Sequence, residues 1–202
     1  MTLSIDHSLN EKEKKMLISK YRTEDIDMEK TVSEFEEKHH LNLPDSYRGF
    51  LIRYNGGDTP ETKFKSGKVS SDVRYFYGIG NVAYSTQKIV DLNDLVSKQI
   101  LPIARDSFGN YIALCLSADS FGSVVFCDHE KGYKVTEIAS SFNEFVAICK
   151  SKKIKPVRTI EERERDLIAN GFGDMLDDEL RRCWQEEIDL YGNIHQEKVV
   201  LD

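Results

Sequence analysis

Several features that would indicate a membrane, secreted or metal-binding protein are missing from this sequence. No apolar run reaches the 18 residues of a membrane-spanning helix, and the first residues lack the basic and apolar regions of a signal peptide. The four cysteines include no C-x-x-C pair, and the five histidines show no metal-binding spacing. We therefore expect a cytoplasmic protein without metal or cofactor, whose cysteines are reduced, buried and apolar in character.

Signatures of catalysis are missing as well. Gly56-Gly57 lacks the lysine and hydroxyl of a P-loop, Gly78-x-Gly80 lacks the third glycine of a dinucleotide site, and no G-x-S-x-G occurs. Cys127 and His129 can share one face of a strand, but neither an orienting group nor an oxyanion signature accompanies them. The sequence predicts no catalytic residues and no enzyme.

Negative charge is concentrated near the C-terminus. Residues 1–158 hold 23 Lys/Arg and 22 Asp/Glu, whereas residues 159–202 hold 5 and 13, so the net charges are +1 and −8. This distribution argues against direct binding of nucleic acid, because phosphate contacts need positive charge. It is compatible with a basic protein partner, such as a nuclease toxin.

The segment 43–57 predicts the helix around which the chain is organised. Pro44 suits the first helical position, and Asn55-Gly56-Gly57 ends the helix because glycine adopts the left-handed conformation at no steric cost. Between them, apolar residues recur at helical spacing: Tyr47, Phe50, Leu51 and Tyr54. We expect Phe50, in the middle of this stripe, to be buried.

The remaining periodicity predicts an α+β fold, with helices packed around a twisted, mainly antiparallel sheet. Capping patterns at Ser8 and Asn10 predict a first helix that carries Met16, Leu17 and Tyr21. Further helices are expected near 25–39, 86–97 and 141–149. Strands joined by short turns are expected at 73–79, 100–104, 111–116, 124–127 and 133–138. Polar residues 56–72 predict a loop with at most a short strand at 63–65.

These motifs, in this order, resemble the SUKH superfamily. The organising helix reads LP-x-x-Y-x-x-F-L-x-x-Y-N-G-G and is preceded by Glu34-Phe35-Glu36. The later motifs are Leu101-Pro102-Ile103-Ala104-x-Asp106, Gly109-Asn110-x-Ile112, Gly122-x-Val124-Val125-Phe126-x-Asp128-His129 and Ile138-Ala139-x-Ser141-Phe142-x-Glu144-Phe145. The superfamily includes bacterial immunity proteins against polymorphic toxins and the fungal regulator of cell-wall assembly. The resemblance implies a binding protein without catalytic residues.

The resemblance covers roughly residues 25–150, so we predict three parts. They are an N-terminal helical extension at 1–21, a SUKH-like α+β domain at 22–155 and an acidic helical C-terminal extension at 156–202. In the extension, Thr159-x-x-Glu162 caps one helix, which ends at Asn170-Gly171. Asp174 opens a second helix, whose apolar stripe consists of Met175, Leu176, Leu180, Trp184 and Ile188. Trp184 is expected to pack onto the main domain, with an oligomer or partner contact as the alternative.

The function implied by the resemblance is immunity to a contact-dependent or secreted toxin in the cytoplasm. Such a protein binds the toxin domain and blocks it sterically; the alternative is a regulatory scaffold of the cell-wall assembly regulator type. The candidate partner-binding residues are the acidic side chains beside Trp184, namely Asp177, Asp178, Glu179, Glu186 and Glu187. We predict a protein partner, no membrane and no direct contact with nucleic acid. The toxin and the oligomeric state stay open.

Overall fold

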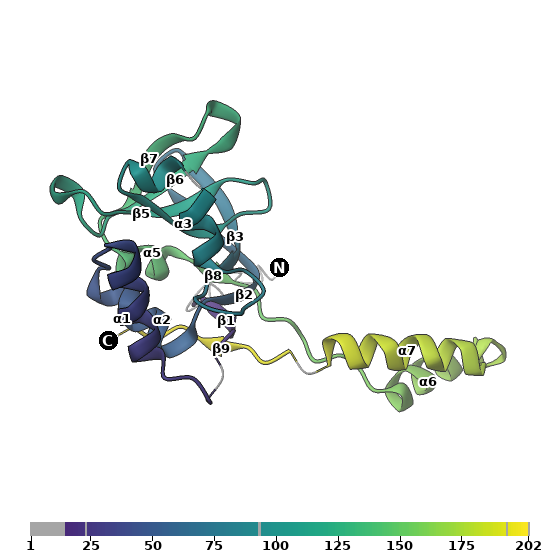
Figure 1. Cartoon of the computed structure of the whole chain (residues 1–202). Helices are drawn as coiled ribbons and strands as arrows, with labels where there is room; N and C mark the ends of the chain where they lie inside the picture. The colour runs from purple at the N-terminus through teal and green to yellow at the C-terminus, as the bar shows by residue number, and fades with distance from the viewer. Residues whose placement is uncertain (1–14, 23, 93, 193, 202) are drawn as a thin grey trace, which may run out of the picture. The chain divides into compact units, whose positions relative to one another are not determined.

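The computed structural model of this chain describes residues 15–22, 24–92, 94–192 and 194–201 and divides into two units (Figure 1). The main domain contains the described residues up to Lys153, together with Gln196 and those after it. The helical hairpin is Ile154–His195. Within the described part of the chain, no helix combines the length and the apolar character needed to cross a membrane.

One antiparallel sheet forms the centre of the main domain (Figure 1). Its nine described strands follow the order β7-β6-β5-β4-β3-β2-β1-β9, and β8 pairs with β2. The strands are β1 (Leu17–Lys20), β2 (Gly57–Ser66), β3 (Val69–Phe76), β4 (Ile100–Arg105), β5 (Tyr111–Cys115), β6 (Val124–Asp128), β7 (Lys134–Ala139), β8 (Lys150–Ser151) and β9 (Glu197–Lys198). The predicted α+β fold with a mainly antiparallel sheet is therefore confirmed.

The two faces of the sheet carry two separate apolar clusters. In β5, Ile112 and Leu114 join the larger cluster, whereas Tyr111 and Ala113 join the smaller one, as expected when side chains alternate along a strand. Buried residues of α1 (Met28–His39), α2 (Asp45–Tyr54) and α5 (Phe142–Ile148) belong to the larger cluster. Two short helices, α3 (Thr86–Leu92) and α4 (Asp94–Ser97), contribute residues to the smaller cluster.

Helix α2 has the buried stripe that its sequence predicts, with small differences at its ends. Pro44 is the N-cap, one position earlier than predicted, and Asn55 is the first left-handed residue, with φ of 53°. The Asn55 side chain is buried and bonds the backbone of Ile79 through both its oxygen, at 2.8 Å, and its nitrogen, at 3.1 Å. Asparagine therefore both ends the helix and fixes the segment that follows β3.

Phe50 lies at the centre of an aromatic cluster and is fully buried, as predicted. The centroid of its ring lies 5.1 Å from that of Phe76 in β3, 5.2 Å from that of Phe142 in α5 and 5.3 Å from that of Tyr54. The aromatic cluster around Phe50 joins α2, α5 and the sheet into one core.

Glu36 connects α1 to α2, because its carboxylate accepts from Leu43 N at 2.8 Å and from Arg48 Nε at 3.2 Å.

Two predictions about the first half of the chain are wrong. Residues 17–20 form strand β1 rather than part of a helix, and Ser8 and Asn10, the predicted caps, lie outside the described residues. Residues 57–66 form strand β2, and β3 begins at Val69, so most of the predicted loop at 56–72 is strand; the predicted strand at 73–79 is confirmed for 73–76. In β2 the inward positions include Pro60 and Thr62, so the alternation of buried and exposed residues is not an alternation of apolar and polar ones.

The end of the chain also differs from the predicted three-part division. Strand β9 pairs with β1, and the Tyr54 hydroxyl accepts a hydrogen bond from Val200 N at 2.9 Å. Val199, in the tail that follows β9, is buried in the main core. The chain therefore returns to the main domain after the hairpin, which is inserted between β8 and β9.

Candidate partner-binding surface

The helical hairpin begins with the capping box that its sequence predicts. Helix α6 (Ile160–Ala169) has Thr159 as its N-cap, and the Thr159 hydroxyl accepts from Glu162 N at 3.3 Å. In return the Glu162 carboxylate accepts from Thr159 N at 3.0 Å. This reciprocal pair satisfies two amide groups that the helix itself leaves without partners, and it fixes where α6 starts.

The connection between the two helices is longer than predicted. Gly171 ends α6 with φ of 81°, and Phe172 N donates to Leu167 O at 2.9 Å. Asp174 lies in a short 3₁₀ turn, η4 (Gly173–Met175), and does not open the next helix. The N-cap of α7 (Asp178–Tyr191) is Asp177, whose carboxylate accepts from Leu180 N at 2.7 Å. The predicted helix start is therefore corrected by three residues.

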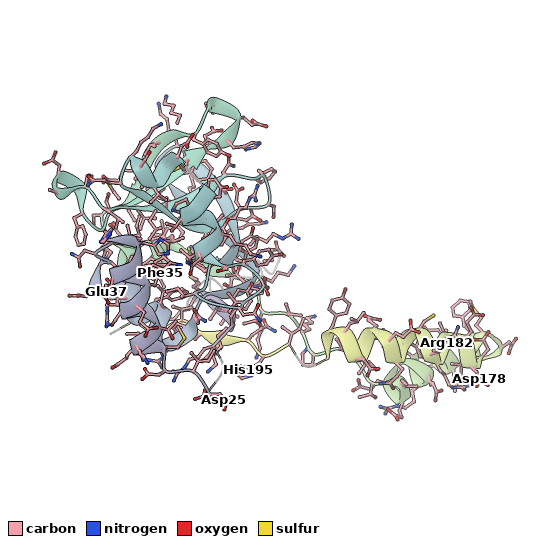
Figure 2. All side chains as sticks on the ribbon, viewed as in Figure 1. Asp25, Phe35, Glu37, Asp178, Arg182 and His195 are labelled. Carbon is pink, nitrogen blue, oxygen red and sulfur yellow. The ribbon has the colours of Figure 1, made fainter. Side chains whose placement is uncertain are left out.

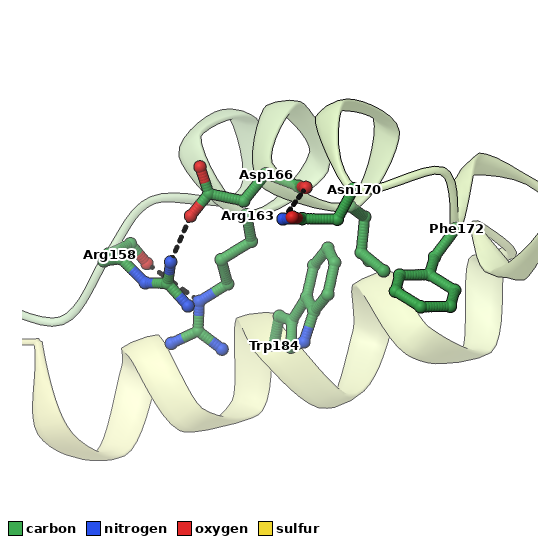
Figure 3. Close-up of a pocket in the computed structure, with 7 residues that line it drawn as sticks. Arg158, Arg163, Asp166, Asn170, Phe172 and Trp184 are labelled. Atoms are coloured by element: carbon green, nitrogen blue, oxygen red, sulfur yellow. Dashed lines mark hydrogen bonds and ion pairs between the residues drawn. The ribbon is translucent and has the colours of Figure 1, made fainter.

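Charged groups and one tryptophan join α6 to α7. Arg163 Nη1 lies 2.7 Å from Glu187 Oε2, and Arg181 Nε lies 2.6 Å from Glu164 Oε1. The Arg163 guanidinium also lies over the Trp184 ring, 5.7 Å from its centroid. Trp184, Arg163 and Phe172 help line a pocket of about 320 Å³ (Figure 3). Trp184 thus packs against α6 of its own hairpin.

The hairpin has no buried interior. None of the described residues between Ile154 and His195 is buried, and large apolar side chains remain exposed. Leu190 is 71% exposed, Met175 62%, Ile168 60% and Phe172 55%. Two helices of 10 and 14 residues cannot enclose a core of their own, so these side chains are available for contact.

The five candidate acidic residues all lie on the hairpin, but they differ in what they do there. Asp177 caps α7 and Glu187 pairs with Arg163, so both stabilise the hairpin itself. Asp178 pairs with Arg181 at 3.2 Å while remaining fully exposed (Figure 2). Glu186 lies 4.0 Å from Arg182, and Glu179 is exposed without an ion pair to any described residue. Asp178, Glu179 and Glu186 are therefore the acids best placed for an external partner.

Ion pairing within the hairpin shifts two pKa values. The hydrogen bond from Arg163 lowers the pKa of Glu187, and the hydrogen bond to Glu164 raises the pKa of Arg181. Both shifts favour the charged forms, so the pairs stay ionised at neutral pH. Arg163 is the more structural of the two cations, because its side chain is only 11% exposed.

Comparison with known proteins identifies the family. The model of the SMI1 / KNR4 family (SUKH-1) matches residues 28–148, which is more than half of the chain and includes every element from α1 to α5. The chain belongs to the SMI1 / KNR4 family (SUKH-1). A relative in Bacillus subtilis (strain 168), the SPbeta prophage-derived uncharacterized protein YokK, is 31% identical over 162 residues. The alignment covers 68% of this chain and 82% of the relative.

The structure also places Cys127 and His129, the two residues that the sequence suggested as a nucleophilic pair. Cys127 is buried, and this burial raises the pKa of its thiol to about 12. His129 Nδ1 lies 3.0 Å from Asn110 Oδ1. No group of three or more His, Cys, Asp or Glu that could hold a metal occurs among the described residues. Absence of catalysis remains a prediction.

The cysteines are less uniform than predicted. Cys127 and Cys149 are buried, but Cys115 is half-buried and Cys183 on α7 is exposed. The Cys115 sulfur lies 3.0 Å from Ser117 Oγ and 2.9 Å from Ser120 Oγ. Partial burial raises the pKa of this thiol, but the hydrogen bonds from the two serines outweigh burial and lower the pKa overall. The expectation that all four cysteines are buried is wrong for Cys183.

Proposed function

We propose that this SUKH-1 protein is a non-catalytic immunity protein that acts in the cytoplasm, where it binds a basic toxin domain and blocks it. The observation that carries the proposal is the composition of the hairpin surface. Between Ile154 and His195 there are 11 Asp/Glu and 6 Lys/Arg, interspersed with exposed apolar side chains. Protein interfaces commonly combine an apolar centre with a polar rim in this way.

The two kinds of side chain would have separate tasks in binding. Charges outside a contact attract a partner over about one Debye length and so raise the association rate. Apolar groups such as Phe172, Met175 and Leu190 lose water only on contact, so they would slow dissociation. The hairpin gains a core when a partner covers these groups. Binding would therefore stabilise the hairpin as well as block the toxin.

The prophage origin given for the Bacillus subtilis relative is consistent with a gene that travels with a toxin on a mobile element. A second candidate, which the resemblance to the SUKH superfamily implies, is a regulatory scaffold of the cell-wall assembly regulator type. The two functions differ in what the absence of the protein would cause. A missing immunity protein exposes the cell to one toxin, whereas a missing scaffold disturbs a pathway of the cell itself.

A growth-protection assay tests the proposed function. Toxin domains encoded next to this gene are expressed in a bacterial host, with and without the full chain. We expect protection from one such toxin, with binding confirmed by co-purification of the two proteins. The proposal is contradicted if no neighbouring toxin is neutralised and deletion of the gene instead alters the cell wall.

The hairpin is tested in the same assay by a triple variant, Asp178→Asn, Glu179→Gln and Glu186→Gln. None of these three acids caps a helix, and Arg181 keeps its shorter ion pair with Glu164 when Asp178 is replaced, so the hairpin should keep its structure. A matched variant replaces three exposed acids of α1 in the main domain, Glu29, Glu34 and Glu37, by Gln. We expect weaker protection only from the hairpin variant. Equal protection by both variants would mean that the toxin binds elsewhere.

A further inference from the structure

A rigid turn between β4 and β5 presents an exposed aromatic side chain. Phe108 is 69% exposed, whereas Asp106, two residues before it, is buried. The Asp106 carboxylate accepts hydrogen bonds from Phe108 N at 2.9 Å, Asn110 N at 2.8 Å, and from the side chains of Ser71 and Asn110, both at 2.7 Å. Four bonds to one buried carboxylate hold the backbone of the turn, so little conformational freedom is lost when Phe108 binds.

Beside this turn, one row of side chains crosses the face of the sheet that carries the smaller cluster. The strand registers align them in the order Tyr75, Arg105, Tyr111, Cys127 and Val135. The Arg105 guanidinium lies over the Tyr111 ring, 5.5 Å from its centroid. Tyr111 stacks with Tyr133, which is 40% exposed. The row therefore carries two buried tyrosines and one arginine, and Val135 at its far end is exposed.

Two arginines, Arg105 of the row and Arg74 next to Tyr75 in β3, line one hollow. The hollow has a volume of about 300 Å³, and neither arginine forms an ion pair with a described acidic residue. Of the acids around them, Asp72 accepts from Ser107 and Asp106 holds the turn. Asp58, opposite Tyr75 in β2, is exposed and lies near Tyr21, whose pKa is raised by burial and by this carboxylate.

A guanidinium on an aromatic surface binds a carboxylate through two parallel hydrogen bonds. The hollow thus offers an anion site. Ser107 and Gly109, the chain neighbours of Phe108, also line it, whereas the Phe108 side chain lines an adjoining hollow with Ser107.

We propose that Phe108, Arg74, Arg105 and the tyrosines around them form a second protein-binding surface, which takes an acidic segment of a partner. A carboxylate of that segment pairs with the two arginines, and a neighbouring apolar residue packs against Phe108. The charge of this surface is opposite to that of the hairpin. The proposal therefore does not depend on the toxin or on the hairpin.

Titration of the full chain with a defined peptide tests this surface. The probe is a synthetic peptide that alternates Glu with Leu and Phe, and the control peptide has Lys in place of Glu. NMR resonances of the Arg74 and Arg105 Nε–H groups and of the Phe108 amide report binding. We expect saturable shifts at these groups with the acidic peptide only. Shifts with both peptides, or none at this surface, would overturn the proposal.

Substitutions with matched controls complete the test. The double variant Arg74→Gln with Arg105→Gln should lower the affinity for the acidic peptide about tenfold or more. Phe108→Ala should lower the same affinity several-fold. Arg53 lies over Tyr54 at 5.6 Å in α2, so Arg53→Gln removes an arginine of the same kind at a different place. Phe121→Ala removes another exposed phenylalanine. If the control variants lose as much affinity as the test variants, the peptide binds through general charge and apolar character, and the proposed site is wrong.

Discussion

The main domain and the helical hairpin owe their structure to different forces. The main domain buries a cluster of large aromatic rings around Phe50, whereas no described residue of the hairpin is buried. The hairpin depends on helix caps and on ion pairs such as Arg163–Glu187. A cap contributes about 1 kcal/mol and an exposed ion pair less, so the hairpin is the less stable region. The main domain therefore supplies the stability of the protein, and the hairpin supplies an accessible surface.

The largest change in the free energy of unfolding is expected for a substitution at Phe50, in the centre of the main core. Phe50→Ala should lower the free energy of unfolding by about 3–5 kcal/mol, because a fully buried ring is lost from a packed core. Trp184→Ala in the hairpin should change the same transition by less than about 0.5 kcal/mol. Urea denaturation monitored by tyrosine fluorescence or near-UV circular dichroism measures both. A loss below about 1 kcal/mol for Phe50→Ala would disprove this description of the core.

A smaller change in stability is expected when the N-cap hydroxyl of one helix is removed in each region. Thr159→Ala in the hairpin and Ser141→Ala in the main domain each remove a hydroxyl that accepts from a helix amide. Each change should cost about 1 kcal/mol, but in different transitions. Thr159→Ala should speed hydrogen exchange within α6 only, and Ser141→Ala should lower the stability of the whole main domain. If Thr159→Ala destabilises the main domain equally, the two regions unfold together and the comparison fails.

The smallest effect concerns pH and the ion pair between Glu187 and Arg163. The pKa of Glu187 is lowered in the folded hairpin from its ordinary value of 4.5, so the pair contributes fully above that pH. The contribution is lost as the pH falls through the lower, folded-state pKa. Helicity of the hairpin should therefore decrease in acid, and Glu187→Gln should reduce this dependence. Circular dichroism and Trp184 fluorescence follow the change. If the unsubstituted protein and Glu187→Gln lose helicity identically in acid, this ion pair does not stabilise the hairpin.

Local patterns in the sequence predicted the parts of the fold that depend on neighbouring residues. The stripe of α2, the capping box at Thr159 and the strands from 100 to 138 all follow from short-range periodicity and turn residues. Strand β1 could not be found in this way, because both of its partners, β2 and β9, lie far from it in the sequence. Most of strand β2 was missed because Pro60 and Thr62 occupy buried positions, so its buried positions are not marked by a run of large apolar residues.

The candidate surface was predictable only in part, for a similar reason. Charge counting placed the acidic residues on α7, but it could not separate Asp177 and Glu187, which stabilise the hairpin, from Asp178, Glu179 and Glu186. That distinction depends on contacts with Arg163 and with the first turn of α7. The row that contains Arg105 was not predicted at all, because it depends on the registers of several strands.

The proposed function requires the exposed acids of the hairpin to attract a basic partner. The direct measurement is the association rate with the toxin domain from the protection assay, at several salt concentrations. Steering should be strongest at 0.01 M salt, where the Debye length is about 30 Å, and weak at physiological strength, where it is about 8 Å. The variant with Asp178→Asn, Glu179→Gln and Glu186→Gln should associate about three- to tenfold more slowly at low salt, with little change in dissociation. Equal association rates at low salt would contradict the claim and limit the hairpin charge to a role in solubility.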